Sequence, residues 1–229
     1  MELKYSDVFY VIKNFLSKEE CKTLIGEYES NKNSSLKENY TNAITNTFHE
    51  GSSNIVSISK NSKNFNLVHK KTQGLIKKWI HHLESFNCFY TEYLKKQIKY
   101  AHSYRILKYD VGENIHPHSD WGNFIHASAT LNLNDSYSGG EFVFFNGKYS
   151  ISLGQGDALI FPADCFWVHE VKPVISGARY SVNSFLCSLP YELLIQLNNQ
   201  IKIMSCSPII KNKFYFEDIH GDRKELKYS

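Results

Sequence analysis

Closely spaced cysteines are missing from this sequence. The five cysteines stand at positions 21, 88, 165, 187 and 206, and none forms a Cys-x-x-Cys pair. An odd number of widely separated cysteines argues against both a disulfide framework and a thiolate zinc site. We therefore expect free thiols and a reducing compartment, the cytoplasm.

Long hydrophobic runs and an excess of one charge are also missing. The N-terminal stretch MELKYSDVFYVIKNF is not continuously apolar, and no run of about 18 apolar residues occurs anywhere. We expect neither a signal peptide nor a transmembrane helix. The net charge is +3 over 229 residues, and Lys and Arg form no long run. This balance disfavours a nucleic-acid groove, so neither a nucleic acid nor a membrane is expected as a partner.

Aromatic residues, in contrast, are abundant. They make up 14% of the chain, with 15 Tyr and 15 Phe, and 42% of all residues are hydrophobic. This composition is typical of β-rich or mixed folds more than of helical bundles. The length suits one domain with terminal elaborations, and we expect a single domain over residues 1–229.

Residues from about 9 to 97 are predicted to form an N-terminal strand and helix region. Phe9 to Ile12 has the pattern of a strand, and a helix follows it. Ser17, with Glu20 three residues later, forms a capping box that marks the start of this helix.

Two further stretches complete this region. Residues 31–65 are rich in Asn, Ser and Lys, and only NIVSIS within them resembles a strand. We expect a long polar loop there, which is either a lid or a merely solvated insertion. The following stretch, NLVHKKTQGLIKKWIHHLESF, predicts an amphipathic helix that lies on a sheet. Its His81 and His82 are interpreted as surface residues rather than ligands.

Residues from about 98 to 187 have the pattern of a β core. Short segments rich in β-branched and aromatic residues alternate with turns such as DVGEN, DSYSGG and GQGD. This spacing is typical of an antiparallel sandwich or barrel. We expect a C-terminal extension over residues 188–229, with a helix after Pro190 and a closing hairpin that turns at His220 to Asp222.

Within the β core, HPHSDWG places His116, His118 and Asp120 at alternate positions. Alternate side chains of a strand point to the same face, so these residues could face one cavity. A metal held by His118 and Asp120 needs a further ligand, and His169 in WVHEVKPV is the candidate. Two histidines and one carboxylate leave positions open on iron for an organic acid and dioxygen, which a closed zinc site would not. The alternative is a polar surface strand that happens to contain histidines.

Arg179 follows His169 by ten residues, on a strand whose inward face would also carry Ser181 and Asn183. A buried guanidinium needs an anion, and the nearby Glu170 faces away from His169 by strand parity. A bound dicarboxylate would balance the charge.

The segments KYDVGENIHPHSDW, TLNLNDSYSGGEFVFF, GDALIFP and HEVKPVISGARYSV resemble the iron(II)- and 2-oxoglutarate-dependent oxygenases, in particular the prolyl 4-hydroxylase-like group. The resemblance covers about Phe9 to Leu186. It implies a mostly β fold, a double-stranded β-helix (jelly roll) with the N-terminal helices packed on one sheet. It also implies Fe(II), 2-oxoglutarate and O2, with ascorbate as a candidate reductant.

The resemblance assigns roles to individual residues. The iron ligands would be His118, Asp120 and His169. Arg179 would bind the distal carboxylate of 2-oxoglutarate, helped by the hydroxyls of Ser181 and Tyr109; the alternative for Tyr109 is an ordinary strand-end aromatic. Asn132 stands where the group often has a tyrosine, and its amide could donate to the same carboxylate. The chemistry would be metal-centred, with no separate acid or base.

Four residues are candidates for substrate binding: Arg105, His116, Trp121 and Trp167. Arg105 shares strand parity with Tyr109 and would favour an anionic substrate group, such as a free carboxylate; alternatively, it points to solvent. His116 is expected at the cavity rim, or as part of a His-x-His pair of cupin type, for which the following glutamate is missing. The two tryptophans either line the entrance or pack in the core.

The resemblance implies a dioxygenase that hydroxylates an unactivated C–H bond and releases succinate and CO2. The expected substrate is a peptidyl proline or an amino-acid-like small molecule. A non-catalytic jelly-roll module that binds a metal or ligand is the alternative from another class, and a cupin-type metalloprotein is a third. A broken triad or a missing Arg179 would favour the binding module, and neither is found in the sequence.

Overall fold

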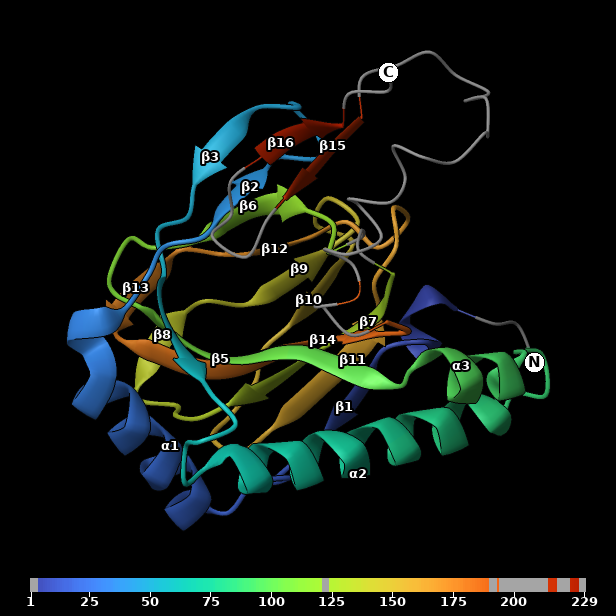
Figure 1. Cartoon of the computed structure of the whole chain (residues 1–229), viewed down its shortest axis with the longest axis horizontal. Coiled ribbons are helices and arrows are strands. Elements are labelled where there is room, and N and C mark those ends of the chain that lie inside the picture. Colours follow the sequence, from blue (N-terminus) through green and yellow to red (C-terminus); the bar gives the residue numbers. More distant parts are fainter. Residues whose placement is uncertain (1–3, 121–123, 190–192, 194–213, 218–222, 227–229) are drawn as a thin grey trace.

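Two facing β-sheets and a layer of helices make up the computed structural model (Figure 1). It describes residues 4–120, 124–189, 193, 214–217 and 223–226. The predicted helix after Pro190 and the candidate Trp121 lie outside the described residues. Strands outnumber helices in the described part, which confirms the mostly β prediction.

The larger sheet has six strands, and the smaller sheet that faces it has four. In spatial order, the larger sheet consists of β1 (Tyr10–Ile12), β11 (Ala158–Pro162), β7 (Ile125–Asn132), β14 (Arg179–Cys187), β5 (Tyr100–Tyr109) and β4 (Asn54–Ile58). The smaller consists of β10 (Tyr149–Ile151), β9 (Phe142–Phe144), β12 (His169–Val171) and β6 (Ile115–His118). All of these pairs are antiparallel, as the turn-rich sequence predicts.

Three two-stranded ribbons and three α-helices accompany the sheets. The ribbons are β8 (Tyr137–Gly139) with β13 (Val174–Gly177), β2 (Asn39–Thr41) with β3 (Phe48–Glu50), and β15 (Phe214–Glu217) with β16 (Arg223–Leu226). The helices are α1 (Lys18–Asn31), α2 (Phe65–Glu84) and α3 (Thr91–Gln97), with 3₁₀ turns at Tyr5–Asp7 and Lys32–Ser34. The β15–β16 pair confirms the C-terminal hairpin, whose predicted turn lies outside the described residues.

The helices begin and pack as the sequence predicts. The Ser17 hydroxyl accepts from the Glu20 amide at 3.1 Å, and the Glu20 carboxylate accepts from the Ser17 amide at 2.8 Å, so the capping box is confirmed. Helix α2 buries one apolar face, including Leu75 and Trp79, against the larger sheet. The Trp79 indole donates to the Val8 carbonyl at 2.9 Å, which satisfies its polar atom.

Strand alternation divides the core into two layers. On β5, Tyr104 and Ile106 belong to the cluster under the helices, whereas Leu107 and Tyr109 belong to the cluster between the sheets. On β14, Val182 faces the helices. The residues of opposite parity on these strands therefore face the space between the two sheets, where a site can form.

The segment 31–65 is not the structureless loop that its composition predicts. It contains the β2–β3 ribbon and strand β4, which pairs with β5 at the edge of the larger sheet. The strand predicted from NIVSIS is confirmed as β4. The β2 and β3 strands have only three residues each, too few for an alternation of apolar and polar residues to be recognised in the sequence. Helix α3 was not predicted either.

Two further observations concern the cysteines and the helices that the structure describes. Cys21, Cys88, Cys165 and Cys187, the cysteines that the structure describes, are free. Within the described ranges, no helix combines the length and apolar character needed to cross a bilayer.

Candidate metal centre

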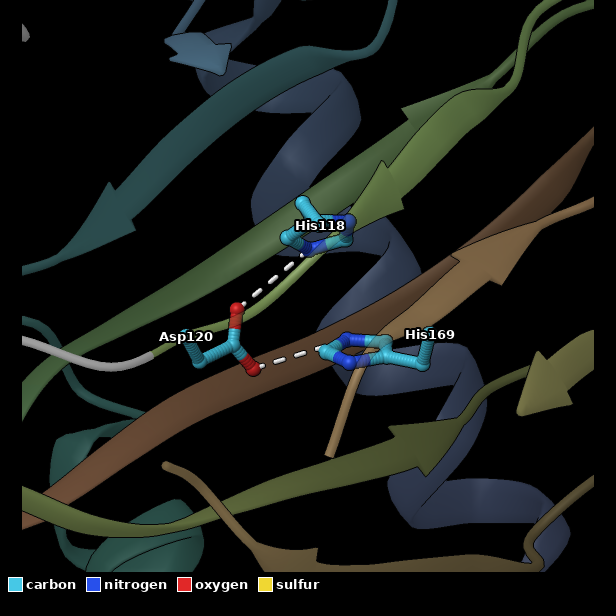
Figure 2. A group of neighbouring side chains, drawn as sticks. All are labelled: His118, Asp120 and His169. Carbon is cyan, nitrogen blue, oxygen red and sulfur yellow. Dashed lines mark ion pairs between the residues drawn. The ribbon is translucent and has the colours of Figure 1, made fainter. Parts of the chain in front are cut away.

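The smaller sheet brings two histidines face to face. His118 at the end of β6 pairs in register with His169 at the start of β12, and Asp120 follows His118 by two residues. Figure 2 shows Asp120 beside the two rings, with one carboxylate oxygen directed at each ring. Its Oδ1 lies 3.3 Å from Nε2 of His118, and its Oδ2 lies 3.5 Å from Nε2 of His169. The potential ligand atoms all lie within 4.8 Å of one another. These residues could hold a single metal ion.

Backbone carbonyls orient both rings. Nδ1 of His118 lies 2.9 Å from the His116 carbonyl, and Nδ1 of His169 lies 3.1 Å from the Trp167 carbonyl. Because a carbonyl only accepts hydrogen bonds, each Nδ1 carries the proton, and the Nε2 of the neutral ring keeps its lone pair for a metal.

The electrostatics of Asp120 and His169 favour ligation. Burial would raise the pKa of Asp120, but the neighbouring His169 and His118, together with the Ser128 hydroxyl, hold it well below its usual range. Burial and the neighbouring His118 lower the pKa of His169 to about 4. Asp120 is therefore anionic and His169 neutral at pH 7, the states in which both bind metals. Ser128, on the inner face of β7, has no motif that marks it in the sequence.

Phenylalanine rings enclose the buried histidine. The ring centroid of His169 lies 4.8 Å from that of Phe161 and 5.4 Å from that of Phe144. These rings restrict the imidazole and keep water from that side. Trp167 packs on Phe9 at 5.3 Å and on Phe145 at 5.5 Å. Of the two interpretations of Trp167, the geometry favours packing.

Arg179 is buried between the sheets, and two of its nitrogens have no hydrogen-bond partner among the described residues. It is 1% exposed, and on the larger sheet it pairs in register with Tyr109, which is fully buried. Its guanidinium lies 5.2 Å from the rings of both Tyr109 and Phe142, and its Nη1 is 3.4 Å from the Ser181 hydroxyl. Arg179 Nε and Nη2 and the Tyr109 hydroxyl have no hydrogen-bond partner among the described residues. Unpaired buried donors around a cation fit an anionic ligand such as a carboxylate.

The absence of a side chain at Gly140 leaves room for the side chain of Arg179. Gly140 has φ +69°, a left-handed conformation that favours glycine. A Cβ at this position would lie 2.9 Å from Cδ of Arg179 and 3.3 Å from the Tyr137 ring. The Gly-Gly turn after β8 therefore lets the backbone approach the arginine stem closely.

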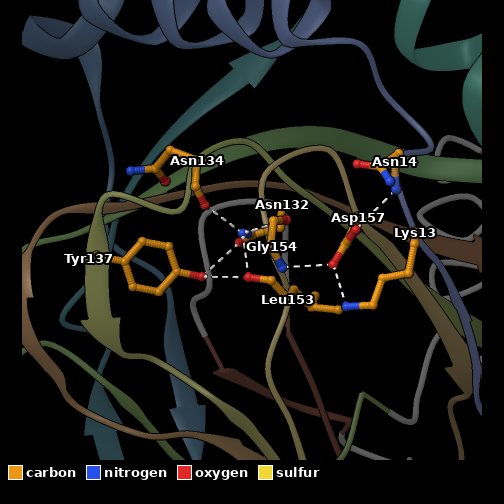
Figure 3. Close-up of polar contacts among 8 residues, drawn as sticks. All are labelled: Lys13, Asn14, Asn132, Asn134, Tyr137, Leu153, Gly154 and Asp157. Carbon is orange, nitrogen blue, oxygen red and sulfur yellow. Dashed lines mark hydrogen bonds and ion pairs between the residues drawn. The ribbon is translucent and has the colours of Figure 1, made fainter.

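Asn132 requires a correction. Its Nδ2 donates to the carbonyls of Asn134 at 2.7 Å, Leu153 at 3.0 Å and Gly154 at 3.2 Å, and its Oδ1 accepts from the Tyr137 hydroxyl at 3.2 Å (Figure 3). Because both amide hydrogens are already engaged, the prediction that this amide donates to a cosubstrate carboxylate is wrong. Asn132 instead joins the turn before β11 to the end of β7.

Arg105 lies inside and does not point to solvent. It is 8% exposed, its guanidinium stacks 4.4 Å from the Phe185 ring, and it forms an ion pair with Glu38. Glu38 comes from the polar segment 31–65, so the sequence offered no sign of this partner.

His116 is partly buried, and the β2–β3 ribbon lies against it. The His116 amide donates to the Tyr40 hydroxyl at 2.9 Å, and its ring lies 4.6 Å from that of His49. The Ala43 amide donates to the Pro117 carbonyl at 2.7 Å. His116 is not part of the cluster of potential ligand atoms, which argues against the cupin register. The ribbon therefore covers the strand that carries His118, one of the candidate ligands.

Comparisons with known proteins agree with this geometry. Residues 104–187 match the family model of the 2OG-Fe(II) oxygenase superfamily. A PKHD-type hydroxylase of Shewanella baltica (strain OS185) is 32% identical over 97 residues, which are 38% of this chain and 42% of that protein. A PKHD-type hydroxylase of Rhizorhabdus wittichii is 46% identical over 56 residues, 23% of this chain and 24% of that protein. The match therefore spans less than half the length of these relatives.

Solved structures show the same fold. A viral collagen prolyl hydroxylase from Paramecium Bursaria Chlorella virus-1, in complex with 2OG, superposes with a TM-score of 0.57 at 18% identity, over 81% of this chain and 97% of that one. A prolyl hydroxylase from Trichoplax adhaerens, in complex with a hypoxia inducible factor peptide fragment, superposes with a TM-score of 0.60 at 18% identity, over 80% of this chain and 84% of that one. The predicted double-stranded β-helix is confirmed.

Proposed function

Because residues 104–187 carry the core of a prolyl hydroxylase-like 2OG-Fe(II) oxygenase, we propose that this protein is an Fe(II)- and 2-oxoglutarate-dependent dioxygenase. It hydroxylates an unactivated C–H bond of a peptidyl proline or an amino-acid-like small molecule, with succinate and CO2 as co-products. The observation that carries the proposal is the pairing of two features across one interior. A two-histidine, one-carboxylate cluster lies on one sheet, and a buried arginine with free donors lies on the other.

The iron would be held by His118, Asp120 and His169. With 2-oxoglutarate and O2 bound, this metal supplies the oxidising chemistry. The protein supplies position and a dry interior. Arg179 would bind the distal carboxylate of the cosubstrate through Nε and Nη2, with the Tyr109 and Ser181 hydroxyls beside it. Burial raises the pKa of Tyr109 to about 12, although Arg179 partly opposes this, so the phenol stays protonated and can donate.

Two observations bear on the substrate. The Chlorella virus protein is described as a collagen prolyl hydroxylase, and the Trichoplax adhaerens protein was solved with a peptide fragment. Both support a proline-containing substrate by likeness of fold. The buried Arg105, in contrast, supports a substrate that carries a charge.

The competing function is a non-catalytic module that binds a metal or ligand. The complete cluster of potential ligands and the unpaired donors of Arg179 both support the enzyme. Succinate formation separates the two hypotheses.

The test is O2-dependent succinate formation from 2-oxoglutarate by the purified protein with Fe(II), with and without ascorbate, proline peptides and free amino acids. We expect Fe(II)-dependent turnover that His118→Ala and Asp120→Ala abolish. His81→Ala is the matched control, because His81 is exposed on α2 and lies away from the cluster. Iron binding without succinate under any condition would favour the binding module.

A further inference from the structure

A row of polar side chains crosses the inner face of the larger sheet. Asn183 on β14 pairs in register with Arg105 on β5 and with Thr130 on β7. Directly opposed residues of antiparallel strands have Cβ atoms about 5 Å apart, so the three side chains are neighbours. A polar row in an otherwise apolar interior requires a partner for each group.

This row lies on the same face of the larger sheet as Arg179. Along the same face of β14, Arg179 precedes Asn183 by four residues, and Phe185 follows it by two. Glu38, the ion-pair partner of Arg105, precedes Tyr40 by two residues, and the Tyr40 ring lies 5.6 Å from the ring of His118. A molecule bound along the row would therefore lie beside the proposed cosubstrate and near the metal.

Arg105 is incompletely paired for a buried cation. Among the described residues its charge partner is Glu38, which it contacts through Nη1, and its buried Nε has no hydrogen-bond partner. A guanidinium has five N–H donors in a fork that suits two carboxylate oxygens. The Phe185 ring fixes the plane of the guanidinium at 4.4 Å. Arg105 can therefore donate hydrogen bonds to a second carboxylate while its ion pair with Glu38 stays in place.

Asn183 adds a neutral donor next to this cation. Its Oδ1 accepts a hydrogen bond from the Thr130 hydroxyl at 2.7 Å, and its Nδ2 has no partner within the described part of the chain. The amide oxygen of Asn183 is thus engaged, and its NH₂ group is available to donate to a ligand oxygen.

Glu38 supplies the opposite charge at the outer end of the row. Its side chain is 44% exposed, whereas that of Arg105 is 9% exposed. Tyr40, two residues further on, accepts from the His116 amide, so this part of the chain lies against the metal-bearing strand. Glu38 can therefore accept hydrogen bonds from a cation that enters beside the site.

We propose that Arg105, Asn183 and Glu38 bind the charged head group of a free α-amino acid, and that this protein hydroxylates such an amino acid. Arg105 and Asn183 bind the carboxylate, and Glu38 binds the ammonium group. The inference rests on the proposed oxygenase function and selects one of its two substrate classes.

Charge balance favours this ligand over an internal proline. The Arg105–Glu38 pair is neutral as a whole, and an amino acid head group is neutral as a whole, so their union buries no net charge. A simple carboxylic acid would bring one uncompensated negative charge. An internal peptide residue would bring neither charge and would leave the buried Arg105 donor unpaired.

The experiment matches changes in the ligand with changes in the protein. The probes are the twenty protein L-amino acids, each also as its N-acetyl and its C-amide form, and a proline peptide blocked at both ends. The readouts are binding to the protein loaded with Mn(II) and 2-oxoglutarate, and the stimulation of succinate formation with Fe(II). The variants are Arg105→Gln and Glu38→Gln. Lys108→Gln is the control, because Lys108 lies on the same strand with opposite parity and pairs with Asp110 at 2.8 Å.

We expect at least one free amino acid to bind and to stimulate turnover, and either blocking group to weaken its binding by about 10- to 100-fold, the effect of a lost charged hydrogen bond. Arg105→Gln should then no longer distinguish carboxylate from carboxamide. Glu38→Gln should no longer distinguish amine from N-acetyl. Lys108→Gln should keep both preferences, and the 2-oxoglutarate affinity should stay the same in all three variants.

Two results would overturn the inference and leave the proposed function intact. One is Fe(II)-dependent succinate formation that the blocked peptide stimulates and no free amino acid does. The other is a bound amino acid whose blocking groups matter equally in the wild type and in both variants. Absence of succinate under every condition would instead refute the proposed function, and the binding readout would still decide whether the head-group site exists.

Discussion

Replacing Arg179 with Met separates the role of this residue in ligand binding from its role in folding. Arg179 is 1% exposed, and its Nε and Nη2 have no partner within the described residues. If each donates one charged hydrogen bond to 2-oxoglutarate, worth about 1.5–3 kcal/mol, their loss costs about 3–6 kcal/mol of binding free energy, or about 10²- to 10⁴-fold in affinity.

The same substitution should not destabilise the ligand-free protein. Without a ligand, the buried charge of Arg179 has no anionic partner among the described residues. Replacing such a charge by an apolar side chain of similar length is often neutral or stabilising. The aromatic contacts with Tyr109 and Phe142, at 5.2 Å each, offset part of this gain by about 0.5–2 kcal/mol. We therefore expect a melting temperature equal to or slightly above that of the wild type.

Thermal unfolding with Mn(II), with and without 2-oxoglutarate, measures both effects. At about 100 times Kd the ligand stabilises the wild type by about 2.7 kcal/mol, which corresponds to a shift of about 5–11 °C for a chain of this size. Arg179→Met should lose this shift. Lys172→Met, which removes an exposed partner of Glu170, should keep it. A variant that retains the shift, or that unfolds many degrees earlier without ligand, would refute the reasoning.

Three further predictions concern the surroundings of the site. Gly140→Ala should destabilise the protein by about 1–3 kcal/mol, because φ at this position is +69°. It should also weaken 2-oxoglutarate binding in the same thermal assay, because the new Cβ would press against Arg179. Unchanged affinity and stability would contradict this. Ser128→Ala should lower iron affinity by about 10-fold in a metal titration, because the hydroxyl helps to keep Asp120 ionised; equal affinity would assign Ser128 to packing alone. Asp157→Asn should cost about 2–3 kcal/mol in urea unfolding at pH 7. Burial raises the pKa of Asp157, but Lys13 and two backbone amides lower it more, so its stabilisation is present above about pH 4 and is lost as the pH falls; a deficit of equal size at pH 3 would refute this.

Relations that depend on spacing along one strand or helix follow from the amino-acid sequence alone. The alternation of His118 and Asp120, the parity of Arg179 and Ser181, and the capping box at Ser17 are local patterns. Side chains two residues apart on a strand share a face whatever the strand pairs with, so the relation of Arg179 to Ser181 was predicted correctly from the sequence. Asp120 lies beyond the end of β6, and its place beside His118 is a finding of the structure. The pairing of His118 with His169 was predicted because a metal needs a further ligand and because the motifs resemble known oxygenases.

Contacts between groups far apart in the chain, in contrast, depend on how the sheets and ribbons pack. Glu38 meets Arg105 across 67 residues, and nothing in a polar segment indicates which of its charges will be paired. Asn132 was misassigned because its amide is satisfied by three carbonyls, two of which belong to a distant turn. The effect of the Ser128 hydroxyl on the pKa of Asp120 also depends on the fold, because no local pattern brings the two residues together. A side chain's face follows from the local period of its strand, whereas its partners follow from how the sheets pack.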